Sequence, residues 1–330
     1  MVELLDCTIR DGGYINNWRF NDKFVLEYIK LCNNIKYVEI GFINKNNNYK
    51  DTIVGPYRCL TEDIINKINN NNFETVVLAD YNDINYELLE KNINIDIVRI
   101  AFHQNYMKDG LEACIKVKNM GYKVSVNAMA INNYDENSMN ILCDKINENK
   151  LDIFYIVDSF GSFNTDDILY YYNFFVSRLH NTQIGFHLHN NMNNAFANYE
   201  YIKLLNTKKP IIVDTTLFGM GRGAGNLPLE LVLINRKISI DNLMHVVKFI
   251  QEFIKPIYKY ENTWGCDLDF LLSGYIKIHP NHIVVLRDLN INMENRFFII
   301  EKMITEKYDF RFFNKVIFLE FLKVYNDILL

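Results

Sequence analysis

Two histidines separated by one residue are the strongest chemical signal in the sequence, in the segment His187-Leu188-His189-Asn190. In an extended strand, residues two apart point to the same face with Cα atoms about 7 Å apart, so both imidazoles can bind one cation. A hard divalent cation held by two histidines also takes an oxygen ligand, and Asp11 can supply it. Arg10, its neighbour, can stabilise a developing enolate oxygen by a charge-assisted hydrogen bond. These residues predict a metal site that stabilises negative charge on a substrate.

The alternative for the histidine pair is two satisfied polar residues near the rim of a sheet, and the alternative for Arg10 is a surface salt bridge. The elements that position these residues decide between the two interpretations. Short apolar runs rich in β-forming residues recur with room for a helix between each pair, which is typical of βα units around a parallel sheet. We predict strands at Glu3–Cys7, Tyr37–Gly41, Thr75–Ala79, Ile97–Ala101, Lys123–Met129, Ile153–Val157, Ile184–His189 and Ile211–Thr216.

Between these runs lie patterns with helical periodicity. We predict helices at Asn21–Asn33, Thr61–Asn69, Gly110–Met120, Glu136–Glu148, Thr165–Leu179 and Asn193–Leu205, and after the last strand at Ile240–Ile254, Leu268–Ile276 and Phe310–Leu329. Eight strands with intervening helices favour an α/β fold of the (β/α)8 TIM-barrel type over an open doubly wound sheet, and no GxGxxG turn follows the first strand. We therefore predict a barrel over residues 1–237 and a C-terminal α-helical appendage over 238–330, which acts as a lid or an oligomerisation region.

In such a barrel the reactive groups lie at the C-terminal ends of the strands. Asp11 follows the first strand and the histidine pair closes the seventh, so these side chains can share one layer of the barrel. This agreement favours the metal site over the alternative, because the strands were assigned from apolar runs alone. The eighth strand leads into a loop with four glycines within seven positions. Gly221, Gly223, Gly225 and the following Asn226 are predicted to bring backbone amides close to the substrate, although loops contain glycine for other reasons as well.

Composition excludes several classes of protein. The net charge is −5 and the pI about 5.8, so the chain lacks the basic surface that nucleic acid requires. The N-terminus lacks the pattern of a signal peptide, and no apolar run spans a membrane, so we expect a cytoplasmic protein without a membrane partner. Its six cysteines are scattered without a CxxC pair, which argues against a zinc-thiolate site.

Three segments together resemble the DRE-TIM metallolyase superfamily, which includes 4-hydroxy-2-oxovalerate aldolase, hydroxymethylglutaryl-CoA lyase and isopropylmalate synthase. They are Leu5-Asp6-Cys7-Thr8-Ile9-Arg10-Asp11-Gly12, His187-Leu188-His189-Asn190, and Gly223-Ala224-Gly225-Asn226-Leu227-Pro228-Leu229-Glu230, which looks most like the hydroxy-oxo-acid aldolases. The resemblance covers roughly residues 3–236. It implies that Asp11, His187 and His189 bind Mn²⁺ or Mg²⁺, that Arg10 stabilises an enolate, and that Asn226 approaches the metal.

One position departs from that pattern. The aldolases have an acid/base histidine two residues after the glycine of Arg-Asp-Gly, where this chain has Gly13-Tyr14. Tyr14 could replace it if its phenol pKa were lowered, and His103, just after the fourth strand, has the better intrinsic pKa. Tyr275 lies in Ser273-Gly274-Tyr275, which loosely resembles the segment with a catalytic tyrosine, and His279 and His282 follow it. Helix packing and capping are the alternative for these last three residues.

The resemblance implies a metal-dependent aldolase or lyase that breaks or forms a C–C bond beside the enolate of a 2-oxo acid such as pyruvate, with an aldehyde as the other substrate. No lysine occurs at the predicted strand ends, so a Schiff-base route is not expected. The alternatives are Claisen chemistry on an acyl-CoA and a non-catalytic barrel subunit. We expect a homo-oligomer, and some related aldolases dock an aldehyde dehydrogenase, although nothing in residues 238–330 supports that partner here.

Overall fold

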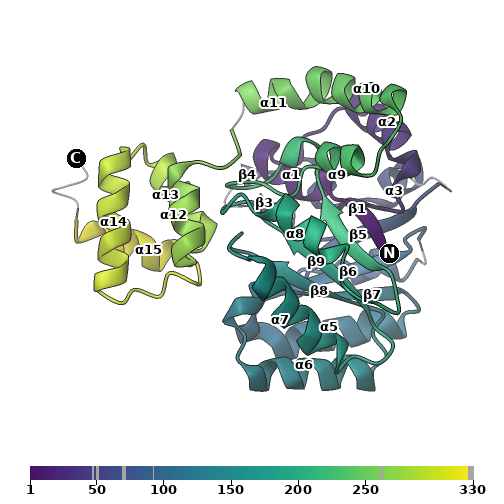
Figure 1. Ribbon diagram of the computed structural model, residues 1–330, viewed down its shortest axis with the longest axis horizontal. Helices are drawn as coiled ribbons and strands as arrows, with labels where there is room; N and C mark the ends of the chain where they lie inside the picture. Colours follow the sequence, from purple (N-terminus) through teal and green to yellow (C-terminus); the bar gives the residue numbers. More distant parts are fainter. Residues whose placement is uncertain (47, 50–51, 69–71, 92, 261–262, 326–330) are drawn as a thin grey trace.

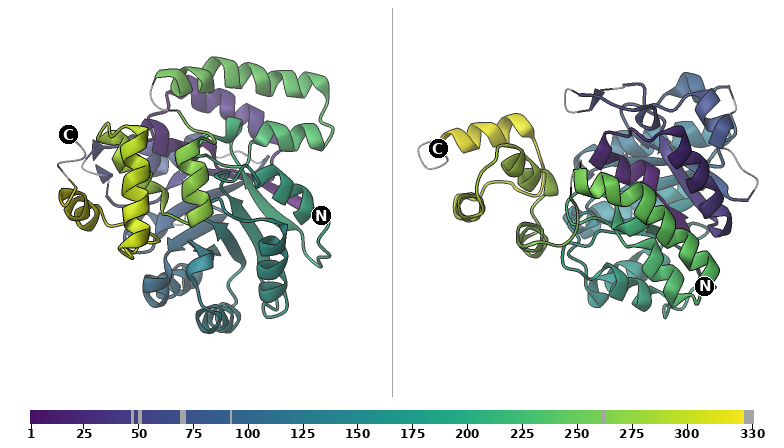
Figure 2. Two further views of the ribbon diagram at one scale, coloured as in Figure 1. Left: turned by 60° about the vertical axis from the view of Figure 1, so that its left-hand side comes forward. Right: turned by 90° about the horizontal axis from the view of Figure 1, so that it is seen from above.

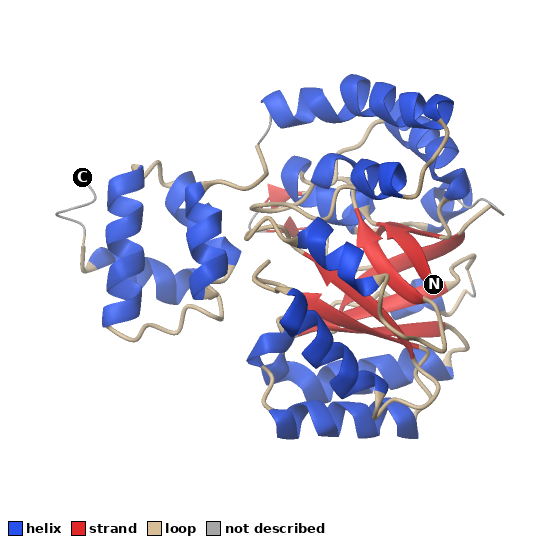
Figure 3. Ribbon diagram, viewed as in Figure 1, coloured by secondary structure: helices blue, strands red, loops and turns tan. Residues whose placement is uncertain are grey.

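The computed structural model describes residues 1–46, 48–49, 52–68, 72–91, 93–260 and 263–325. Eight parallel strands close into a barrel in the order β1-β10-β9-β8-β7-β6-β5-β2. Figure 3 shows these strands at the centre of the larger part of the molecule. They are β1 (Val2–Asp6), β2 (Tyr37–Phe42), β5 (Glu74–Asp80), β6 (Ile97–Phe102), β7 (Lys123–Ala128), β8 (Ile153–Asp158), β9 (Gln183–Leu188) and β10 (Ile211–Thr215). The predicted TIM barrel and all eight predicted strands are confirmed.

The barrel strands are buried on both faces, which explains why they read as nearly continuous apolar runs. Every residue of β2, β6, β8 and β10 is buried. Residues such as Leu5, Val76, Ile97 and Tyr155 form a separate small hydrophobic cluster, and most other apolar residues of the strands join a large cluster with the helices. Two charged residues, Glu39 on β2 and Arg99 on β6, lie among them with no exposed surface.

Helices surround the barrel, as Figure 1 shows. The predicted helices correspond to α2 (Asp22–Leu31), α3 (Glu62–Ile68), α5 (Met107–Asn119), α6 (Glu136–Glu148), α7 (Thr165–Val176) and α8 (Ala195–Ile202). The predicted end of the second of these, Asn69, lies outside the described residues. The structure adds α1 (Thr8–Asn16), α4 (Tyr86–Leu89) and α9 (Leu229–Asn235), together with the short hairpin of β3 (Asn48–Tyr49) and β4 (Thr52–Ile53).

Helix α1 follows β1 directly and is the unexpected element that positions two site residues. Its sequence contains Gly12 and Gly13, which disfavour a helix in isolation. Packing explains the glycines: a Cβ on Gly13 would lie 2.1 Å from the Trp18 ring, and one on Gly12 would lie 2.8 Å from the sulfur of Met220. The Trp18 indole donates a hydrogen bond to the carbonyl of Arg10 at 2.8 Å. Tertiary contacts therefore hold this short helix against the barrel.

After the barrel, α10 (Ile240–Phe249), a π-helical turn (Ile250–Ile254) and α11 (Lys255–Tyr260) form a rod along the barrel's side, seen at the top of Figure 1. Its apolar residues Val246, Phe249 and Ile254 belong to the main hydrophobic cluster of the barrel. The rod begins just after the predicted domain boundary between residues 237 and 238, yet it packs against the barrel. The predicted helix Ile240–Ile254 is therefore present, with its last turn in the π-helical form. That boundary itself stays a prediction.

Four further helices form a group with its own hydrophobic cluster, which we call the cap. They are α12 (Leu268–Ile276), α13 (Pro280–Asp288), α14 (Met293–Thr305) and α15 (Lys315–Lys323). Figures 1 and 2 place the cap beside one end of the barrel. The prediction of a helix over Phe310–Leu329 is wrong at its start, because Asn314 caps α15 by accepting hydrogen bonds from two amides of its first turn. The end of that prediction, after residue 325, lies outside the described residues.

No helix within the described ranges is both long and apolar enough to cross a membrane.

Candidate metal centre and active site

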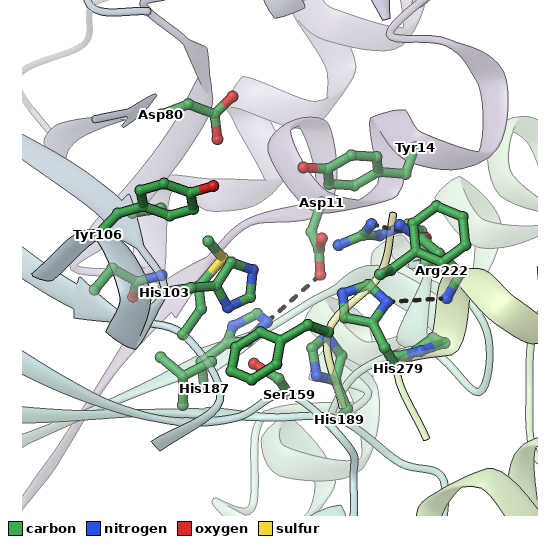
Figure 4. Close-up of a pocket in the computed structure, with 18 of the residues that line it drawn as sticks. Asp11, Tyr14, Asp80, His103, Tyr106, Ser159, His187, His189, Arg222 and His279 are labelled. Atoms are coloured by element: carbon green, nitrogen blue, oxygen red, sulfur yellow. Dashed lines mark hydrogen bonds and ion pairs between the residues drawn. The ribbon is translucent and has the colours of Figure 1, made fainter. Parts of the chain in front are cut away.

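Three ligand-type side chains converge at the C-terminal end of the barrel, as Figure 4 shows. Asp11 lies on α1 and His187 on β9. His189 directly follows Leu188, the last residue of β9. One donor atom from each of the three lies within 4.8 Å of the others. The Nε2 of His187 is 3.6 Å from a carboxylate oxygen of Asp11. The three predicted metal ligands are therefore brought together.

Each histidine is oriented from behind by a hydrogen bond at its other ring nitrogen. The Nδ1 of His187 lies 2.8 Å from the carboxylate of Asp214 on β10, and the Nδ1 of His189 lies 2.8 Å from the carbonyl oxygen of Asp158. Partners of this kind fix the tautomer and direct Nε2 toward a metal. Burial, together with the nearby His187, lowers the pKa of His189 to about 3, so its imidazole is neutral as a ligand must be.

The Asp11 carboxylate is buried and ionised. Burial by itself raises its pKa, but Arg10 and the two histidines outweigh burial and hold the pKa of Asp11 well below its usual range. The guanidinium of Arg10 lies 3.0 Å from Asp11 and 2.5 Å from Glu39. An anionic carboxylate oxygen beside two imidazole nitrogens is a donor set that suits a divalent cation of the manganese or magnesium type.

A chain of buried charged side chains connects Arg10 with Asp214, the residue that orients His187. Glu39 binds Arg10 on one side and lies 3.3 Å from Arg99 on the other. Arg99 also lies 2.9 Å from Asp214, the carboxylate that orients His187, and its guanidinium rests 3.9 Å from the centre of the Tyr155 ring. Sequence reasoning missed Glu39, Arg99 and Asp214 as site residues. A signal for them was present in the sequence, because each is a charged residue inside an otherwise largely apolar strand.

Asn226 supplies a test of whether the site fits a cation. Its side-chain nitrogen donates to Asp11 at 2.6 Å and to the carbonyl of Met220 at 3.1 Å, while its buried Oδ1 has no hydrogen-bond partner among the described residues. An orphaned buried oxygen this close to a ligand carboxylate costs free energy unless a positive group satisfies it. The residues present therefore fit a divalent cation, and Asn226 adjoins the site as expected.

The glycines of the strand-eight loop shape the loop, and none of Gly221, Gly223 and Gly225 lines the cavity described below. A Cβ on Gly221 would lie 2.3 Å from the amide nitrogen of Asn226, and one on Gly225 would lie 2.2 Å from the carbonyl oxygen of Gly219. Their contribution in this structure is to let Asn226 approach Asp11. Substrate binding by the three glycines stays a prediction without geometric support.

The site opens into a cavity of about 600 Å³ between the barrel end and the cap. The barrel lines it with the three ligands, Arg10, Tyr14, His103 and the loop residue Arg222, among others. The cap contributes the start of α13 and the segment from Tyr308 to Ile317. The interior of the cavity is thus built from two regions far apart in the sequence.

Both candidate proton-transfer residues of the barrel lie on the wall of this cavity. His103 precedes a short helical turn after β6, and its buried Nδ1 has no hydrogen-bond partner among the described residues. Burial, and then the positive charge of Arg222, lower the pKa of His103 to about 4. The guanidinium of Arg222 rests 4.0 Å from the centre of the Tyr14 ring. His103 is therefore neutral near pH 7 and has a nitrogen available to accept a proton.

The three candidates from the cap separate in the structure. Tyr275 is 75% exposed on α12 and does not line the cavity, so the structure does not bring this predicted catalytic residue to the site. His279 lines the cavity, and its side chain caps α13 by accepting from the amide of Asn281. His282 is buried in the cap among Phe313, Phe318 and other rings, where it serves packing.

A second polar group that sequence reasoning missed lies across the cavity from the ligands. The Asp80 carboxylate at the end of β5 binds Arg58 at 2.6 Å and the side chain of Asn44 at 2.8 Å. The guanidinium of Arg58 stacks 3.9 Å from the Phe42 ring. Both Asp80 and Arg58 line the cavity, so polar groups face the substrate from two sides.

Comparison with known proteins agrees with this geometry. The chain is 31% identical to the 4-hydroxy-2-oxovalerate aldolase of Thermomicrobium roseum over 145 residues, which are 42% of this chain and 38% of that enzyme. It is 25% identical over 241 residues to the oxaloacetate decarboxylase of Mycobacterium tuberculosis, covering 69% of this chain and 67% of that one. The match to the aldolases thus spans less than half of their length.

Among solved structures, the N-terminal domain of a candidate aldolase from Bacteroides vulgatus superposes with a TM-score of 0.78 and 26% identity, covering 91% of this chain and all of that one. The sequence profile of the HMGL-like family matches residues 1–251, which contain the whole barrel and every predicted metal ligand. The chain therefore belongs to the HMGL-like family, within the superfamily that its three motifs indicated.

Proposed function

We propose that the protein is a divalent-metal-dependent carbon–carbon lyase that cleaves or forms a bond beside the enolate of a 2-oxo acid, with an aldehyde as the second substrate. The observation that carries the proposal is the convergence of Asp11, His187 and His189 from two elements, with both imidazoles oriented by further hydrogen bonds. The named aldolase relatives and the family support the reaction class.

One cation held by these three residues, Mn²⁺ or Mg²⁺, would supply positive charge beside the keto and carboxylate oxygens of the 2-oxo acid. The protein's own contribution to charge stabilisation is Arg10, which lines the cavity next to Asp11. Because Glu39 and Asp11 hold its guanidinium in place, Arg10 needs no reorganisation when negative charge develops on the enolate oxygen.

In the cleavage direction a base removes the hydroxyl proton of the aldol, the neighbouring C–C bond breaks, and its electron pair moves into the enolate as the aldehyde leaves. We assign the base to His103, because it is neutral and its Nδ1 faces no partner among the described residues. Tyr14 is the second candidate, since it lines the same cavity under the positive charge of Arg222. Protonation of the enolate carbon completes the cycle.

A second candidate function is decarboxylation of a 2-oxo diacid. The relative that the chain matches over the greater length is an oxaloacetate decarboxylase. Loss of CO₂ leaves the same enolate but requires no base for a hydroxyl proton, which agrees with Gly13-Tyr14 in place of the aldolase histidine. Claisen chemistry on an acyl-CoA receives less support, because the segment from Gly223 to Glu230 looks most like the hydroxy-oxo-acid aldolases and a named relative is such an aldolase.

The test is a screen of the Mn²⁺-supplemented protein with pyruvate and a panel of aldehydes, analysed by mass spectrometry, beside parallel assays of oxaloacetate decarboxylation and of thiol release from acetyl-CoA. Aldol products that depend on the metal support the first proposal. Pyruvate formed from oxaloacetate without any aldol product selects the second. Thiol release without either product would overturn both, and inactivity in all three assays would favour a non-catalytic barrel subunit.

A further inference from the structure

Three apolar or aromatic side chains on the cavity wall stay partly exposed, although one of them, Tyr106, stacks on Tyr81 with ring centroids 5.3 Å apart. Tyr106, after β6, is 50% exposed, and Ile317, on α15, is 57% exposed. Phe312, in the segment before α15, is half-buried. All three line the cavity, and we call them the distal subsite.

None of the three hydrophobic clusters of the described residues includes a member of the distal subsite. The neighbouring Phe313 lines the cavity as well, but it also packs on the cap cluster, with its ring 5.0 Å from that of His282. Phe312 instead lies against the site, with its ring 6.3 Å from that of His103. Apolar groups left exposed inside a ligand cavity commonly mark the surface that a ligand covers.

The size and charge of the cavity indicate what that ligand is. Cavities of roughly 300–1,000 Å³ hold drug-sized molecules, so a pyruvate unit beside the metal ligands leaves most of the 600 Å³ for the second substrate. On the cavity wall Arg58 is already paired with Asp80 at 2.6 Å, and Asp309 adds a further negative charge to the lining, so a second anionic group on the substrate is disfavoured. The remaining space suits an apolar body.

On the basis of the proposed lyase function, we infer that the aldehyde substrate carries an aromatic or bulky apolar group, which the cap residues Phe312 and Ile317 bind together with Tyr106. Edge-to-face contact between Phe312 and an aromatic substrate would place the carbonyl of that substrate near His103, the assigned base. The cap thereby becomes the determinant of aldehyde specificity, while the barrel generates the enolate.

The experiment compares phenylacetaldehyde with acetaldehyde in condensation with pyruvate by the full-length, Mn²⁺-supplemented protein. A separate readout, deuterium incorporation at C3 of pyruvate in D₂O, reports enolate formation without any aldehyde. We expect kcat/KM for phenylacetaldehyde to exceed that for acetaldehyde at least tenfold. Incorporation of deuterium with equal kcat/KM for the two aldehydes overturns the inference and leaves the proposed function standing. Absence of deuterium incorporation and of every aldol product overturns both.

Variants assign the preference to the distal subsite. Phe312→Ala is expected to reduce the phenylacetaldehyde to acetaldehyde ratio of kcat/KM about tenfold, and Ile317→Ala to reduce it about threefold, because each removes contact area for the apolar group. Val316→Ala is the matched control, since Val316 is 69% exposed on the same helix and does not line the cavity. Melting temperatures exclude unfolding, and Phe312→Leu, which keeps an apolar side chain, should recover part of the ratio. An unchanged ratio in a folded Phe312→Ala protein contradicts the assignment.

Discussion

Replacing Asp214 by Asn tests how the protein prepares His187 to bind a metal. The substitution keeps the shape of the side chain and removes its negative charge. In the structure one oxygen of Asp214 lies 2.8 Å from the Nδ1 of His187 and 2.9 Å from Arg99. The change therefore acts on a ligand's orientation and on a buried ion pair at once.

The two effects have separate magnitudes. Loss of an outer-shell partner of a metal-binding histidine typically lowers metal affinity about 10- to 100-fold, or about 1.4–2.8 kcal/mol. Breaking a buried ion pair typically costs about 3–5 kcal/mol of stability. Arg99 still has Glu39 as a partner at 3.3 Å after the substitution. We therefore expect the loss of stability of the metal-free protein to be at the lower end of this range, about 3 kcal/mol.

Calorimetric titration with Mn²⁺ measures the affinity, and urea unfolding of the metal-free protein measures the stability. The matched control is Asp269→Asn in the cap, because Asp269 is fully buried and binds Arg287 at 2.7 Å and Arg296 at 3.0 Å. That variant should lose comparable stability and keep the affinity for Mn²⁺. If Asp214→Asn also binds Mn²⁺ as tightly as the unaltered protein, its orienting role is refuted and Asp214 is merely structural.

Three further predictions follow from individual residues. His103→Ala should reduce aldol turnover by a factor of about 10² to 10⁴ and leave deuterium exchange of a pre-bound 2-oxo acid, measured by NMR, less affected; equal losses in both would contradict its role as the hydroxyl base. Gly221→Ala should weaken Mn²⁺ binding in a calorimetric titration, because the added methyl would lie 2.3 Å from the amide nitrogen of Asn226; unaltered affinity would show that Asn226 does not matter to the metal. Burial lowers the pKa of His282 to about 4 from an ordinary value near 6.5, so the unfolded state binds a proton between these values while the folded state does not. Stability is then lost as pH falls through that window, by about 2 kcal/mol between pH 7 and 5, and His282→Phe should show a smaller loss in urea unfolding at the two pH values.

The strands and the metal ligands could be predicted because their signals are local. A buried parallel strand is a continuous apolar run, and the two histidines of one strand are two positions apart whatever the partner strands are. Asp11 needed only its place after the first strand. These signals do not depend on which residues of neighbouring strands pair, so the barrel and the metal ligands could be predicted from the sequence.

The buried charge chain could not be predicted in the same way. Glu39 and Arg99 are 60 residues apart, and Arg99 and Asp214 are 115 apart, so their pairing depends on the closure of the barrel. Helix α1 was missed because its two glycines oppose helix formation and packing against Trp18 and Met220 compensates. For Tyr275, the resemblance of a short segment said nothing about which face of α12 the side chain occupies, and it lies on the exposed face.

The cap residues of the cavity were also beyond sequence reasoning. Phe312 and Phe313 are identical neighbours that both line the cavity, yet only Phe313 also packs on the cap's own cluster. The helix expected from residue 310 begins at Lys315 instead, so both phenylalanines lie in the segment before it.

The most direct test of the central claim is the amount of manganese that the purified protein retains after incubation with Mn²⁺ and removal of free ion, measured by atomic spectrometry for the unaltered chain and for Asp11→Asn. Asp11 is the ionised oxygen ligand beside the two imidazoles, so its loss should abolish retention. We predict about one ion per chain in the unaltered protein and almost none in the folded variant. Equal retention by the two proteins, or none by either, would contradict the metal centre on which the proposed chemistry rests.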